Sequence, residues 1–129
     1  MRLFKNAWFR RFARKENLSD GWLWDAVARA EKGLVDADLG GGVLKLRIAC
    51  PGQGRSKGFR TIVFYREGDK AFFVYGFPKS AINNLREDEK EQFKRAAKSV
   101  LASSGDEIHQ LIANGQLEEV MQGGQEIPH

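Results

Sequence analysis

The chain has 129 residues, a hydrophobic content of 42% and a formal net charge of +4 at pH 7. This length suits one domain with its own core, and no apolar run approaches the ~18 residues that span a membrane. The first residues lack the apolar core of a signal peptide, so we expect a cytoplasmic protein. The single Cys50 excludes an internal disulfide, and the two histidines stand at 109 and 129. The pattern indicates no histidine-based triad and no metal site, and we expect no cofactor.

The N-terminal third predicts two helices. Apolar side chains recur at helical spacing near the start of the chain and predict a helix at about residues 5–15. A second helix begins at Ser19 or Asp20, whose side chains accept free amide hydrogens, and it ends at Gly33. We expect these helices to form a hairpin that packs its apolar side on a sheet.

Three strands are predicted next. Residues 39–50 alternate between an apolar face and a face that carries Lys45 and Arg47. Residues 59–66 and 70–77 are separated by Glu-Gly-Asp, which is a compact hairpin signal. The last of these strands is apolar on both faces, which indicates a central position or a place beneath a helix.

The C-terminal part returns to helical periodicity. A helix is predicted at about residues 87–102, and a shorter helical piece over 107–120 is interrupted by Asn114-Gly115. This order of elements predicts an α+β fold, with a small antiparallel sheet, an N-terminal helical hairpin and a C-terminal helix. Helices would cover one face of the sheet, and basic residues would line the other. We assign residues 1–104 to the domain, and 105–129 to a helical extension with a disordered tail.

Positive charge gathers between residues 39 and 66. This segment holds six basic and no acidic residues, which leaves 15 basic against 17 acidic residues in the rest of the chain. Such a polarised block is typical of a surface that binds a polyanion. For Lys45, a solvated strand face is an equal alternative, and Arg66 beside two acids suits an ordinary surface role. The six are Lys45, Arg47, Arg55, Lys57, Arg60 and Arg66.

Two stretches resemble a known family. Residues 49–60 read Ala-Cys-Pro-Gly-Gln-Gly-Arg-Ser-Lys-Gly-Phe-Arg, and residues 75–79 read Tyr-Gly-Phe-Pro-Lys. They resemble the RelE/HigB toxins of bacterial type II toxin-antitoxin systems, whose sequences carry G-x-G-K-S-G-G-F-R and Y-G-F-x-K. The resemblance covers about residues 2–103. It implies a RelE-like fold and an endoribonuclease that cuts mRNA, in many relatives on the ribosome, with a cognate antitoxin as its partner.

The resemblance also implies catalytic roles. Arg60 matches the strand arginine that contacts the scissile phosphate, and Lys57 matches a loop cation assigned to substrate binding or proton transfer. Lys79 stands where relatives place a cation after the last strand. A cluster of Arg and Lys suits metal-independent RNA cleavage, because Arg clamps phosphate oxygens and a crowded Lys can transfer protons.

Further residues are candidates for substrate binding. Arg47 would reach the same groove if its strand neighbours that of Arg60, as a short connection favours. Arg55 and Lys45 are candidates for holding the RNA backbone. Relatives place a Tyr or His near the start of the final helix, where this chain reads Ser-Ala-Ile-Asn-Asn at 80–84. The general acid or base is therefore unassigned.

Two other functions stay open. A ParE-like toxin would share the fold and inhibit DNA gyrase by docking, without a nuclease site. A non-enzymatic nucleic-acid-binding domain would use the same cations, and the missing Tyr or His keeps this alternative open. The dense Arg and Lys groove favours the nuclease, because a docking inhibitor does not need phosphate clamps.

Overall fold

The fold is that of a computed structural model, which describes residues 1–49, 58–78 and 85–122. The disordered tail that we expected after residue 122 lies outside the described residues. In the part that is described, no helix is both long and apolar enough to cross a membrane. The elements in chain order are β1 (Arg2–Asn6), α1 (Ala7–Lys15), α2 (Asp20–Glu31), β2 (Ala37–Gly40), β3 (Val43–Ala49), β4 (Gly58–Arg66), β5 (Lys70–Pro78), α3 (Glu87–Leu101), α4 (Gly105–Ala113) and β6 (Leu117–Glu119).

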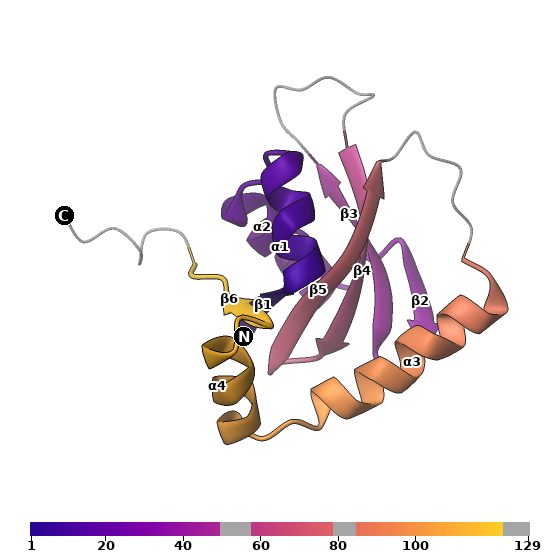
Figure 1. The fold of residues 1–129 in the computed structure, drawn as a ribbon. Coiled ribbons are helices and arrows are strands. Elements are labelled where there is room, and N and C mark those ends of the chain that lie inside the picture. The colour runs from indigo at the N-terminus through magenta and orange to yellow at the C-terminus, as the bar shows by residue number, and fades with distance from the viewer. Residues whose placement is uncertain (50–57, 79–84, 123–129) are drawn as a thin grey trace.

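A single twisted sheet is the centre of the fold (Figure 1). Within the described residues it has six strands in the order β2-β3-β4-β5-β1-β6. β1 pairs in parallel with β5, and the other neighbouring strands are antiparallel. The predicted mixture of helices and strands is confirmed, but the prediction of an antiparallel sheet is wrong because the sheet is mixed.

The chain begins with a strand, so the predicted N-terminal helical hairpin is also wrong. Leu3 and Phe4 are both fully buried, and they enter two different cores because neighbouring strand residues point to opposite faces. Burial on both faces hides the alternation of a strand, and the apolar spacing then resembles a helix. α1 begins only after Asn6, whose side chain accepts a hydrogen bond from the Phe9 amide at 2.7 Å. α1 contacts β5, whereas α2 contacts β3.

The first face of the sheet lies under α1 and α2 (Figure 1). The predicted start of α2 is confirmed, because the Ser19 hydroxyl accepts a hydrogen bond from the Trp22 amide at 3.3 Å. Its predicted end is confirmed by Gly33, which adopts a positive φ of 84°. The apolar side of β3 faces this core, as the alternation predicts. Its buried residues are Leu44, Leu46 and Ile48.

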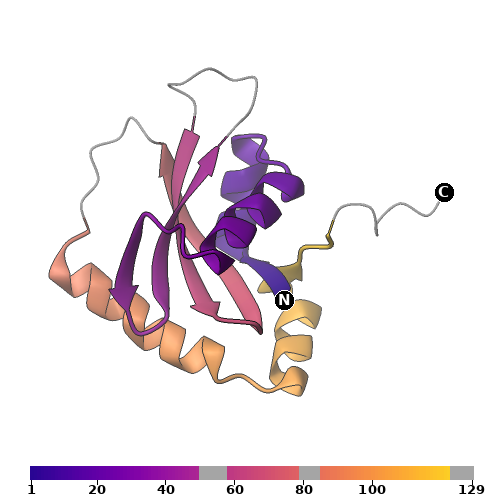
Figure 2. The same cartoon turned by 180° about the vertical axis from the view of Figure 1, so that it is seen from behind.

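The second face is only partly open. α3 crosses it (Figure 2), and Ala97 of this helix is buried with Val43, Ile62 and Phe64 of the sheet. The expectation that helices cover only one face is therefore wrong. The apolar residues that bring α3 to this face begin at Val43, two positions before Lys45 on the same side of β3. Basic residues line only the remainder of the face.

Residues 105–122 pack on both cores. The predicted helical piece ends at Ala113, and Gly115 with a φ of 77° precedes β6. β6 pairs with β1, a long-range contact that no local pattern in the sequence predicts. Ile108 and Leu117 join the second core, and Val120 is 3% exposed in the first.

Candidate active site

Two arginines face each other across β3 and β4. In the antiparallel register Arg47 pairs with Arg60, and Lys45 pairs with Ile62 two positions along. Directly paired residues of an antiparallel sheet share one face, with Cβ atoms about 5 Å apart. The prediction that the strands of Arg47 and Arg60 are neighbours is confirmed, and the pairing brings three candidate cations to one face.

Asp36 anchors the Arg60 side chain. The Nε atom of Arg60 donates to Oδ2 of Asp36 at 2.5 Å, and the exposed fractions of the two side chains are 27% and 29%. Asp36 is itself held in place, since its backbone amide donates to the Lys45 carbonyl at 2.9 Å. The carboxylate offsets part of the repulsion that two opposed arginines would suffer. It also holds the guanidinium in one orientation.

Among the described residues, this contact is the only side-chain hydrogen bond of Arg60, and it does not use the phosphate-binding part of the guanidinium. A guanidinium has five N–H donors, and the Nε–H engages Asp36. The two terminal nitrogens carry the other four, which can donate to two phosphate oxygens in the fork geometry of arginine. Arg47, which is exposed on the neighbouring strand, adds a second cation to the same face.

The other predicted site residues have different outcomes. Lys57, Arg55 and Lys79 lie outside the described residues, so their roles remain predictions. Their chain neighbours are at one end of the sheet, where Phe59 of β4 pairs with Pro78 of β5. Arg66 is at the opposite end of β4, exposed and 3.9 Å from Asp69, as expected for a surface residue.

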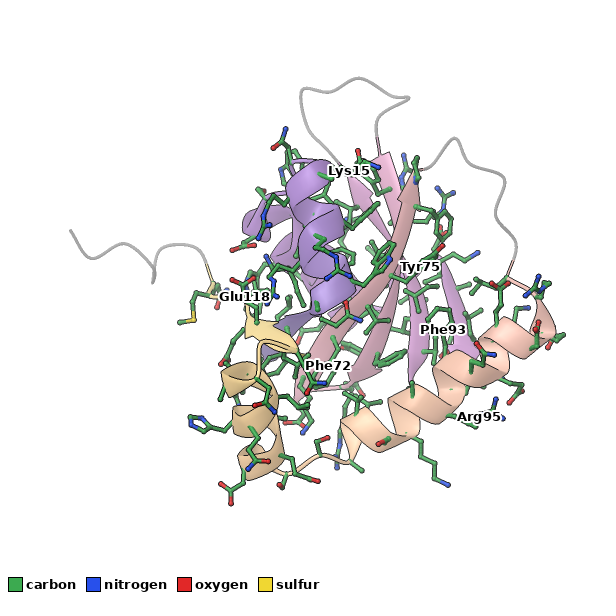
Figure 3. The ribbon with its side chains drawn as sticks, in the orientation of Figure 1. Lys15, Phe72, Tyr75, Phe93, Arg95 and Glu118 are labelled. Carbon is green, nitrogen blue, oxygen red and sulfur yellow. The ribbon has the colours of Figure 1, made fainter. Side chains whose placement is uncertain are left out.

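The two tyrosines have different environments. The Tyr65 hydroxyl is buried and has no hydrogen-bond partner among the described residues, and burial raises the pKa of its phenol. Tyr75 is half-buried, and it pairs with Ile62 on the face that carries Lys45. Its ring lies 4.6 Å from the Trp8 ring and 6.1 Å from the Phe93 ring, between α1 and α3 (Figure 3). Of the two phenols, Tyr75 is the one placed for contact with a ligand on this face.

The sequence did not predict Asp36 as a residue of the site. It follows the second helix and has no motif around it, and it meets Arg60 only because the β2–β3 hairpin brings the two together. A metal site is not indicated where the structure is described, because no group of three His, Cys, Asp or Glu side chains gathers there.

Comparison with known proteins identifies the family. The family model described as "RelE toxin of RelE / RelB toxin-antitoxin system" matches residues 1–120. No curated protein matches the chain. The matched region contains β3, β4 and β5, and it extends through α4 and β6. The chain therefore belongs to the RelE toxin family of toxin-antitoxin systems.

Proposed function

We propose that this RelE-family toxin is a metal-independent endoribonuclease that cleaves mRNA on the ribosome. The observation that supports it most is the pairing of Arg60 with Arg47, with Asp36 bound to the Nε atom of Arg60. A guanidinium fixed in this way presents its terminal nitrogens as a ready clamp for a phosphodiester. Membership of the family also implies an antitoxin partner.

The proposed reaction uses the RNA's own 2′-hydroxyl. The 2′-oxygen attacks the adjacent phosphorus, its proton passes to a base, and the bond from phosphorus to the 5′-oxygen breaks as that oxygen takes up a proton. The products are a 2′,3′-cyclic phosphate and a 5′-hydroxyl. Negative charge on the phosphorane oxygens is greatest in the transition state, so Arg60 and Arg47 would stabilise that state more than the bound substrate.

The remaining candidates complete the proposed site. Lys57 and Lys79 are proposed to transfer protons or bind the scissile phosphate, and together with Arg60 they make up the proposed catalytic group. Arg55 and Lys45 are proposed to hold the RNA backbone. For Lys45, its half-exposed position on the same face as Arg47 supports this role.

Replacement of Arg60 by Ala tests the catalytic site. We expect cleavage to fall about 10²-fold, because one transition-state clamp is worth on the order of 3 kcal/mol. Growth inhibition on expression should disappear with it. The matched control is Arg66→Ala, which removes the same charge from the other end of β4 and should keep full activity. If the Arg60→Ala protein stays as toxic as the parent at equal soluble expression, the proposed site is wrong.

Mapping of cut sites separates the proposal from its alternatives. Purified protein is incubated with ribosomes and message, with free message, and with gyrase and plasmid DNA. Cuts in the message that depend on Arg60 support the nuclease. Inhibited supercoiling without RNA cuts identifies a ParE-like inhibitor, and RNA binding without cuts identifies a non-enzymatic binding domain.

A further inference from the structure

A second group of cations lies outside the candidate active site, at the start of the chain. Residues 1–15 hold six basic and no acidic residues, a run equal in charge to the block at 39–66. Arg2 and Lys5 of this run pair with acids. The other four all belong to α1, and they are Arg10, Arg11, Arg14 and Lys15.

The α1 cations are unbalanced. Among the described residues none of the four forms an ion pair, and the one hydrogen bond that their side chains make there runs from Arg10 to the Gly115 carbonyl at 3.2 Å. α3 offers a contrast, because its four basic residues share the helix with four acidic ones. Four uncompensated charges in nine residues repel one another, and an anionic partner would relieve that repulsion.

The cations line both sides of α1. On one side Arg10 and Arg14 border a groove of about 420 Å³, which also contains Glu118, itself 3.4 Å from Lys5. On the other side a groove of about 230 Å³ is lined by Arg11 and Lys15 with two aromatic residues of the same helix, Trp8 and Phe12. α1 is thus a ridge with two of its own cations in each adjoining groove, and Lys5 adds a third cation to the first groove.

The ridge is continuous with the candidate active site. The Trp8 ring, 36% exposed, packs at 4.6 Å on Tyr75, which lies on the face of the sheet that carries Lys45. One turn later, Phe12 packs edge-on against Phe59, which precedes the candidate catalytic arginine in β4 and points to the first face of the sheet. Figure 3 shows Lys15 at the end of α1 that approaches the ends of β4 and β5. A polymer that crosses the site therefore meets α1 next.

We propose that α1 is a second RNA-binding surface, which holds the phosphodiester backbone on both sides of the helix outside the site of cleavage. The choice of RNA rests on the proposed function. It is also favoured by the geometry, because an acidic peptide in one groove would leave the cations of the other groove unpaired. RNA carries a charge at every nucleotide and can contact both grooves. The backbone can belong to the message or to ribosomal RNA.

The test removes two charges from one groove. Arg11→Gln with Lys15→Gln is the test variant, and Arg95→Gln with Lys98→Gln on α3 is its control. Both pairs contain one exposed Arg and one exposed Lys that form no ion pair among the described residues, so both variants should fold normally. Figure 3 shows Arg95 on the side of α3 away from the sheet. Every protein also carries Arg60→Ala, which keeps the RNA intact.

Binding is measured to oligouridine and, separately, to ribosomes without message, at several salt concentrations. Each phosphate contact adds about 0.7 to the salt slope and about fivefold in affinity at 0.1 M salt. The α1 variant should therefore bind roughly 25-fold more weakly with a slope smaller by about 1.4, and the α3 control should change less than about twofold. A loss on oligouridine assigns the surface to the message, and a loss on ribosomes alone assigns it to ribosomal RNA.

Two results would overturn the proposal. One is an equal change in the α1 and α3 variants, which would mean that net charge alone matters. The other is unchanged RNA binding with loss of the antitoxin complex, which would make α1 a protein-docking surface. A parent protein that cuts no RNA, while its binding still depends on α1, would disprove the proposed nuclease and leave this surface in place.

Discussion

Replacement of Asp36 by Ala is the most informative single change at the candidate site. It removes the carboxylate that binds Nε of Arg60, and Asp36 itself lies on the link before β2, not on the strands that carry the cations. Only about one quarter of each side chain is exposed, so the loss of the pair should cost the folded protein about 1–3 kcal/mol, more than the loss of a fully exposed pair. A fall in kcat per folded molecule would therefore report on catalysis and not on folding.

Two opposing effects set the size of the change. An unanchored arginine side chain regains up to about 2 kcal/mol of rotamer entropy, which must be lost again when it clamps the phosphate. A loss of about 1.4 kcal/mol from this cause lowers kcat about tenfold. Removal of the negative charge beside Arg60 also strengthens its attraction for phosphate by about 1 kcal/mol, which lowers KM several-fold. We expect kcat and KM to fall together.

The assay compares two variants under steady-state conditions on ribosomes programmed with one message. Asp36→Asn keeps an oxygen that accepts from Nε but has no charge, so it should lower KM and leave kcat near that of the parent. Asp36→Ala should lower both. An Asp36→Ala protein with the kcat of the parent would show that Asp36 does not orient Arg60 for the reaction.

Three further predictions concern stability. A Cβ on Gly76 would stand 2.6 Å from Cε2 of Phe12, so Gly76→Ala should destabilise the protein by about 1–3 kcal/mol in urea unfolding. Tyr65→Phe removes a buried hydroxyl that has no hydrogen-bond partner among the described residues, and should leave the free energy of unfolding unchanged or raise it by about 1 kcal/mol. Hydrogen bonding from Arg2 lowers the pKa of Glu119 below its ordinary 4.5, so the stability that this carboxylate contributes is present above that pH and is lost as the pH falls. Glu119→Gln should flatten this acid dependence in thermal unfolding, and an unchanged pH profile would exclude the pair as its source.

Sequence alone predicted the elements that local patterns specify. The cap at Ser19 and the positive-φ stop at Gly33 define α2, and alternation from Val43 to Arg47 separates an apolar from a basic side of β3. The neighbouring positions of β3 and β4 follow from a short connection, and they bring Arg47 opposite Arg60. The sequence pattern and the chain order therefore predict that Arg47 and Arg60 lie on neighbouring strands, but they do not predict the contact with Asp36.

The missed features depend on contacts between distant segments. β1 and β6 are short strands that exist because they pair with each other, and β1 also pairs with β5. The Asp36 contact needs the β2–β3 hairpin. The charge at the start of the chain is different, because six cations without an acid, four of them in α1, are visible in residues 1–15.

The two ends of the second sheet face differ in their residues and in their roles. Along β3 the same side changes from buried Val43 to half-buried Lys45 and then to exposed Arg47. α3 packs on the apolar end, and the cations stand beyond it. Because the apolar contacts that stabilise α3 lie at the other end and Arg47 is exposed, replacements of Arg47 remove little buried surface. Loss of cleavage in such variants can therefore be assigned to lost phosphate contacts, whereas substitution of Val43 would disturb the fold itself.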